Sequence, residues 1–72
     1  MSDIWHSTYT IPVRCNEHVP VEVELITGKY GVYYTSGCGI VEAKDVEYAL
    51  GWLCWVKRWR FIFEEEEVES ID

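Results

Sequence analysis

Near-strict alternation of side-chain character between residues 19 and 26 constrains this chain more than any other feature. Apolar Val19, Val21, Val23 and Leu25 alternate there with Pro20, Glu22, Glu24 and Ile26. A period of two residues is typical of a β-strand that buries one face. The segment therefore predicts a strand, and with it a sheet that must cover an apolar surface.

Residue patterns typical of strands also occur at residues 8–15, 30–35 and 40–43. Polar or glycine-containing turns separate them at residues 16–18, 27–29 and 36–39. In the first strand, one face is expected to carry Tyr9, Ile11, Val13 and Cys15. Pro12 has no backbone N–H group, so this strand is expected to lie at a sheet edge or to begin pairing late.

Residues 46–58 have the spacing of an amphipathic helix. Asp45 is a suitable N-cap, and Lys57 and Arg58 would lie in the last turn, where the helix dipole favours cations. A final strand is expected at residues 59–64. The predicted class is α+β, a small antiparallel sheet of three to five strands with one helix packed on it, in the order β-β-β-(β)-α-β.

The chain length of 72 residues predicts one domain over residues 1–72, with residues 65–72 considered as a disordered acidic tail. Hydrophobic residues make up 49% of the chain and aromatic residues 15%. A domain this small buries only about 60% of its unfolded surface. The apolar surplus therefore predicts an exposed patch that contacts a protein partner or a second copy.

An aromatic row on the expected helix is the candidate for that patch. Its members, at i, i+4, i+7 and i+11, are Tyr48, Trp52, Trp55 and Trp59. One interpretation is that the row completes the core, and the other is that Trp52 and Trp55 lie at the centre of an interface. For Tyr48 and Trp59, at the ends of the row, a place in the core is an alternative. A membrane-surface helix is disfavoured because the expected helix lacks a cationic polar face.

The net charge of −7 opposes binding to nucleic acid or membranes and suits a basic protein partner. The densest acidic run is Glu64, Glu65, Glu66 and Glu67. This run is a solvated tail, a guard against edge pairing, or an acidic display that competes for a basic groove. Glu22 and Glu24 would add a second carboxylate row if their strand exposes that face.

Metal and thiol chemistry have weaker support. Cys15 and His18 have a metal-like spacing, and Cys38 and His6 could complete a zinc set, but a true knuckle has two such pairs. Cys38 between two glycines lacks a base nearby in the sequence, so we expect no enzyme activity. No cofactor is predicted, and a small zinc or thiol protein stays as an alternative.

The odd count of three cysteines argues against a secreted disulfide scaffold, and no signal-peptide pattern is visible, so a cytoplasmic location is expected. In size, charge and layout the chain resembles small acidic proteins of phages and mobile elements that block host enzymes. The acidic balance, the surplus of aromatic residues and the absence of a catalytic set favour an inhibitor of a nucleic-acid-handling enzyme. The expected function is a protein-binding module that modulates a partner, with a structural or assembly subunit as a further alternative.

Overall fold

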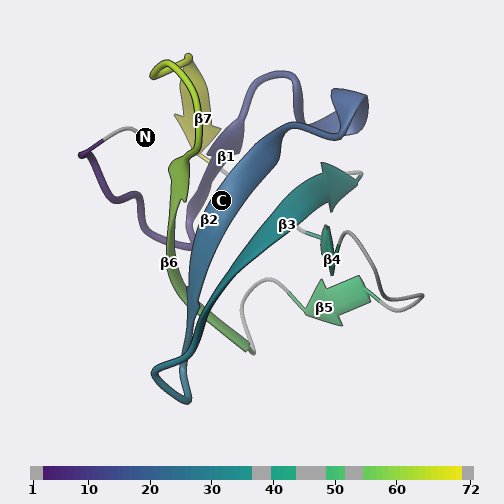
Figure 1. Ribbon diagram of the computed structural model, residues 1–72. Coiled ribbons are helices and arrows are strands. Elements are labelled where there is room, and N and C mark those ends of the chain that lie inside the picture. Colours follow the sequence, from purple (N-terminus) through teal and green to yellow (C-terminus); the bar gives the residue numbers. More distant parts are fainter. Residues whose placement is uncertain (1–2, 37–39, 44–48, 52–54, 71–72) are drawn as a thin grey trace.

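The alternating segment forms the central strand of the main sheet. The computed structural model describes residues 3–36, 40–43, 49–51 and 55–70. Strand β2 (Pro20–Leu25) pairs with β3 (Tyr30–Ser36) on one side and with β6 (Val56–Phe61) on the other. Strands β4 (Ile40–Ala43) and β5 (Ala49–Gly51) continue beyond β3, which gives the antiparallel order β5-β4-β3-β2-β6 (Figure 1).

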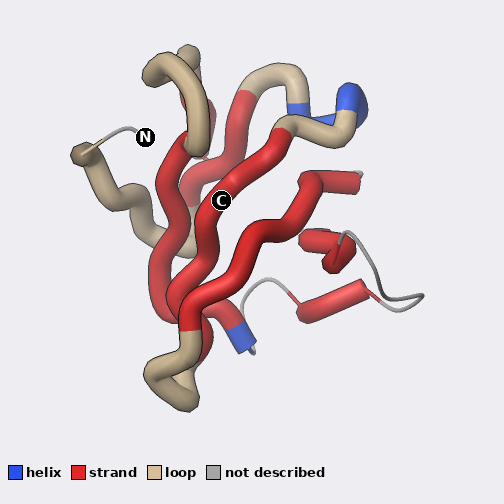
Figure 2. The backbone as a smooth tube through the Cα atoms, viewed as in Figure 1, coloured by secondary structure: helices blue, strands red, loops and turns tan. Residues whose placement is uncertain are grey.

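A second, two-stranded sheet joins the two ends of the chain. Strand β1 (Thr10–Pro12) pairs antiparallel with β7 (Val68–Ser70), and a short 3-10 turn, η1 (Cys15–Glu17), links β1 to β2 (Figure 2). The segment before β1 also contacts β6, because His6 and Trp59 form an isolated antiparallel bridge. The segment that contains His6 and strand β2 are therefore both paired with β6.

The helix expected over residues 46–58 is wrong, and with it the α+β class. Apart from the single residue Trp55, the described parts of that segment are strands, since residues 49–51 form β5 and β6 begins at Val56. The molecule is instead built mostly of small antiparallel sheets. The expected N-cap, Asp45, lies outside the described residues, as do residues 46–48 and 52–54.

The physical reason for this correction is that pairing with β2 outweighs the helical spacing, and residue preferences give a helix little support. Valine and the aromatic residues lose side-chain freedom in a helix, and Gly51 inside a helix would cost about 1 kcal/mol relative to alanine. In β6, by contrast, Trp59 lies opposite Val23 and Phe61 opposite Val21. Lys57 and Arg58 therefore pair with Glu24 on the neighbouring strand and do not lie at a helix C-terminus.

The first expected strand is also shorter than the pattern at residues 8–15 suggests. Only residues 10–12 pair, and Tyr9 and Val13 are exposed although Ile11 and Cys15 are buried. After Pro12 the chain leaves the sheet and enters η1, where the Glu17 N–H donates to the Arg14 carbonyl at 2.9 Å. Strands β2, β3 and β4 lie within or close to their predicted segments.

The core lies between the inner face of β2 and β6 and the segments that cross it. Its buried cluster consists of Val19, Val21, Val23, Val56, Trp59 and Phe61. The Trp59 indole N–H donates to the carbonyls of Ser7 and Thr10, at 3.1 Å each. Buried Thr35 donates its hydroxyl to the Cys15 carbonyl, so the N-terminal segment and η1 are both attached to the sheet.

Within the described residues, the chain has no helix with the length and apolar character needed to cross a membrane.

Candidate binding surfaces

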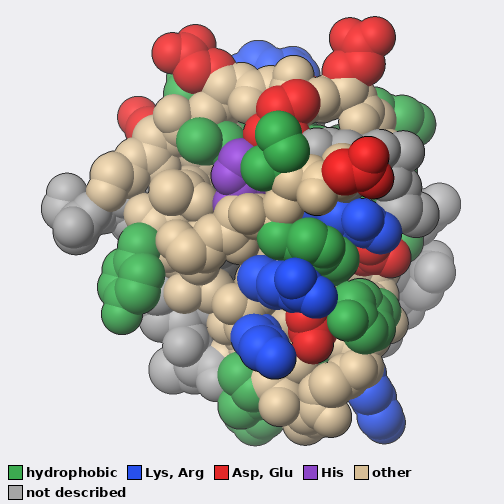
Figure 3. All heavy atoms as spheres, turned by 90° about the vertical axis from the view of Figure 1, so that its left-hand side faces the viewer, with side chains coloured by type: hydrophobic (Ala, Val, Ile, Leu, Met, Phe, Trp, Pro, Cys, Tyr) green, Lys and Arg blue, Asp and Glu red, His purple; other side chains and the backbone are tan. Residues whose placement is uncertain are grey.

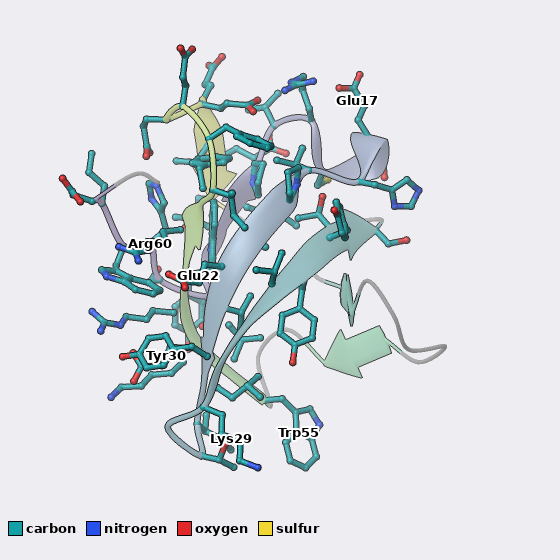
Figure 4. The ribbon with its side chains drawn as sticks, in the orientation of Figure 1. Glu17, Glu22, Lys29, Tyr30, Trp55 and Arg60 are labelled. Atoms are coloured by element: carbon teal, nitrogen blue, oxygen red, sulfur yellow. The ribbon has the colours of Figure 1, made fainter. Side chains whose placement is uncertain are left out.

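A ladder of opposite charges crosses the outer face of β2 and β6. Glu22 lies opposite Arg60, and Glu24 lies opposite Arg58. The Arg60 Nε donates to the Glu22 carboxylate at 2.6 Å, and the Arg58 Nε donates to Glu24. Figure 4 shows Glu22 and Arg60 side by side on this face. The two carboxylates expected as a second acidic row are therefore paired with arginines.

The electrostatics of the ladder follow from these hydrogen bonds. The bond from Arg58 lowers the pKa of Glu24 below its ordinary value, and partial burial of the carboxylate opposes that shift. The bond to Glu24 in turn raises the pKa of Arg58. The Lys57 ammonium lies 3.7 Å from the same carboxylate and adds to the attraction.

Trp5, from the segment before β1, covers the two arginines of the ladder. Its ring centroid lies 4.1 Å from the Arg58 guanidinium carbon and 4.5 Å from that of Arg60, which is the geometry of a cation–π contact. Tyr30 meets the edge of Trp5 at a centroid distance of 6.0 Å. We call this surface the cationic face, and it consists of Trp5, Tyr30, Val32, Lys57, Arg58 and Arg60.

The acidic run forms the connection between β6 and β7, residues 62–67, which we call the acidic loop. Glu66 accepts two hydrogen bonds from Arg14, at 2.9 and 2.6 Å, and Glu65 lies 2.6 Å from the His6 Nε2. The Val13 N–H donates to the Glu67 carbonyl at 3.1 Å. The loop is therefore attached to the β1 region, and β7 follows it within the segment expected as a tail.

Phe63 and two carboxylates face outward from this attached loop. The Phe63 side chain is 71% exposed, the largest value among the described large hydrophobic residues, and Glu64 and Glu67 are exposed as well. Arg14 also binds Glu17 at 2.6 Å, so one guanidinium connects η1 to the loop. These hydrogen bonds raise the pKa of Arg14, with the Glu66 bond as the largest cause.

The expected aromatic row is divided between different environments. Trp59 is fully buried, whereas Trp55 is 52% exposed and lies beside the β2–β3 hairpin, away from Arg60 in Figure 4. Because residues 56–61 form a strand, Trp55 and Trp59 do not share a helical stripe. Tyr48 and Trp52 lie outside the described residues.

Among the described residues, the weak metal candidates do not lie close together. Cys15 is buried in η1, and His18 is exposed with a left-handed backbone (φ 54°). His6 stacks on Trp59 at 4.6 Å, and Cys38 lies outside the described residues. Within the described part of the chain, no group of three metal-ligating side chains is close enough to hold an ion.

Sequence reasoning identified the glutamates of the loop but missed Trp5 and the role of the arginines. Arg58 and Arg60 alternate like Glu22 and Glu24, and this matched spacing is the signal that could have paired the two segments. Trp5 had no such signal. Figure 3 shows the side of the molecule that lies at the left in Figure 1. On that side, acidic side chains lie along the upper margin, and most basic and apolar side chains lie below them.

Comparison with protein-family models finds no match, and comparisons with curated proteins and with solved structures find none either.

Proposed function

We propose that this chain is a protein-binding module that modulates or inhibits its partner by placing the acidic loop on a basic surface. The observation that carries the proposal is the exposed Phe63 ring, which stands among carboxylates on an attached loop. Aromatic side chains anchor interfaces, and carboxylates around them steer a basic partner into position. Attachment at Arg14 and His6 reduces the entropy lost when the loop is bound.

The class of partner follows from the charge. A chain of net charge −7 attracts basic surfaces, and the grooves of nucleic-acid-handling enzymes are basic. The loop alone would supply the acidic display, because Glu22 and Glu24 are paired with arginines. An inhibitor of such an enzyme, acting in the cytoplasm, is therefore the form of the proposal that we favour.

The first test is affinity capture from a lysate of the source cells with the parent chain and Phe63→Ser. We expect the parent to retain a stoichiometric partner that Phe63→Ser loses. Ile26→Ser is the matched control, because Ile26 is 58% exposed but lies next to the β2–β3 turn. Equal retention by the parent and Phe63→Ser would contradict the role of the loop.

Charge is tested by the double variant Glu64→Gln/Glu67→Gln. Its affinity for the recovered partner should fall at least about tenfold at low ionic strength, and the loss should shrink as salt screens the carboxylates. Asp3→Asn, which removes an exposed carboxylate outside the loop, should have a much smaller effect. An affinity that is independent of both salt and these two glutamates would contradict an acidic display.

The inhibitor part is tested separately with the purified partner. If the partner handles nucleic acid, the parent chain should displace a labelled oligonucleotide from it, and Phe63→Ser should not. A ternary complex that contains chain, partner and oligonucleotide would disprove competition for the groove and leave the binding function standing.

A further inference from the structure

The basic side chains of the cationic face are more exposed than the two glutamates with which they pair. The side chains of Lys57, Arg58 and Arg60 are 63%, 40% and 21% exposed, whereas those of Glu24 and Glu22 are 9% and 16% exposed. The outward charge of this face is therefore positive, although the chain as a whole carries −7. A positive surface in an acidic protein suits an acidic partner segment.

The same face also offers apolar contact. Tyr30 is 54% exposed and Val32 is 45% exposed, and the register places them opposite Glu24 and Glu22, so they share the ladder's face. Trp5 is partly exposed above the arginines. An occupant that combines carboxylates with an aromatic side chain would match both the charge and the apolar surface.

The acidic loop has this complementary composition and follows β6 directly in the chain. Within one copy it does not cover the cationic face: Glu65 and Glu66 bind His6 and Arg14, while the arginines of the face bind Glu22 and Glu24. Figure 3 shows acidic side chains at the margin of the side on which most basic ones lie below them. One side of the molecule thus has a negative part and a positive part.

We propose that the cationic face binds a second copy of this chain, with the acidic loop of each copy on the cationic face of the other. A two-fold axis through that side would bring each positive part onto a negative part, and such closed pairs are the commonest protein assemblies. The inference rests on the loop being the binding element proposed above. It adds that self-association occupies the loop until a basic partner displaces the second copy.

Net repulsion does not prevent such a pair at physiological ionic strength. Charges farther apart than about 8 Å are largely screened at about 0.15 M salt, whereas charges in contact across the interface are screened less. Two copies of net charge −7 therefore repel weakly at a distance, and the opposite charges of loop and face attract when they meet.

The experiment is sedimentation velocity over a range of concentrations with a charge exchange between face and loop. Lys57→Glu and Glu64→Lys each place like charges in both contacts, so each should raise the dimer dissociation constant at least about tenfold, which is about 1.4 kcal/mol. An equimolar mixture of the two variants should dimerise again, because both of its contacts join opposite charges. The double variant Lys57→Glu/Glu64→Lys should also dimerise, and it has the parent's net charge.

A parent chain that stays monomeric at all concentrations would overturn the proposal. Single variants that dimerise as well as the parent would overturn it too, as would a mixture that fails to recover association while near-ultraviolet circular dichroism shows folded chains. The two proposals fail separately. A monomeric parent that still captures a partner contradicts only self-association, and a dimer that captures none contradicts only the proposed function.

Discussion

Trp59 and Trp55 belong to the same short stretch of sequence but occupy opposite environments. Trp59 is fully buried, stacks on His6 at 4.6 Å and meets Phe61 edge-on at 5.0 Å, and its indole N–H has two carbonyl partners. Trp55 is 52% exposed, and its carbonyl accepts a hydrogen bond from Ile26 at 3.0 Å. The two side chains should therefore differ strongly in what they contribute to stability.

Trp59→Ala should lower the free energy of unfolding by about 3–5 kcal/mol, because it removes a large buried side chain from the core. Trp55→Ala should lower it by about 0.5 kcal/mol or less, as expected for an exposed position. Urea denaturation followed by far-ultraviolet circular dichroism measures both values. Trp59→Phe should be intermediate, since it keeps much of the volume but removes the indole N–H that donates to the Ser7 and Thr10 carbonyls. Similar losses for Trp59→Ala and Trp55→Ala would disprove the assigned core.

At the level of elements, β2 and β6 are joined through both of their faces. The inner face pairs Val23 with Trp59, and the outer face pairs Glu24 with Arg58. The two contributions depend differently on pH, because only the outer pair titrates. Stability measurements in acid therefore isolate the outer ladder from the hydrophobic core.

The low pKa of Glu24 predicts a defined acid dependence. Because its folded-state pKa is below the ordinary value of 4.5, the ladder stabilises the fold above that pH and loses this contribution as pH falls through the folded-state value. The melting temperature of the parent should thus exceed that of Glu24→Gln at neutral pH. The difference should shrink as pH falls below the ordinary value of 4.5 and through the folded-state pKa of Glu24.

Glu67→Gln, which removes one exposed carboxylate from the loop, serves as the control for net charge. Thermal melts of all three chains across the same pH series check the prediction. A difference between the parent and Glu24→Gln that stays constant from neutral to strongly acidic pH would show that the carboxylate does not stabilise the fold through Arg58.

For the whole molecule, the two ends of the chain are held together by contacts around β6. The β1–β7 pairing, the His6–Trp59 bridge and the Arg14–Glu66 pair join segments that are more than fifty residues apart. Arg14 is 54% exposed, so its ion pairs contribute little to global stability. We infer that their main effect is to hold the acidic loop in place.

Arg14→Gln should therefore make the acidic loop more accessible without unfolding the protein. A protease that cleaves after glutamate should cut within residues 64–67 several-fold faster in Arg14→Gln than in the parent, with little change in melting temperature. Lys29→Gln, a matched loss of positive charge in the β2–β3 turn, should leave the rate unchanged. Equal cleavage rates in all three chains would show that the loop does not depend on Arg14.

Parts of the fold and site could be predicted wherever a local pattern has one physical interpretation. The alternating valines indicated β2, and Gly28, with φ of 90°, occupies the predicted turn before β3. The glutamate run was visible as the acidic surface. Its attachment was not, because Arg14 and Glu66 are 52 positions apart and nothing local indicates that they meet.

By itself the sequence determined that residues 20–25 form a strand of a small antiparallel sheet, that the chain is acidic and that an acidic run covers residues 64–67. Only the tertiary structure decided the state of residues 56–58, whose helical spacing lost to pairing with β2. It also decided that Trp59 is core and that Trp5 covers Arg58 and Arg60. The physical reason is that periodicity reports which face of a segment is apolar, whereas burial and ion pairing depend on which distant segment lies against that face.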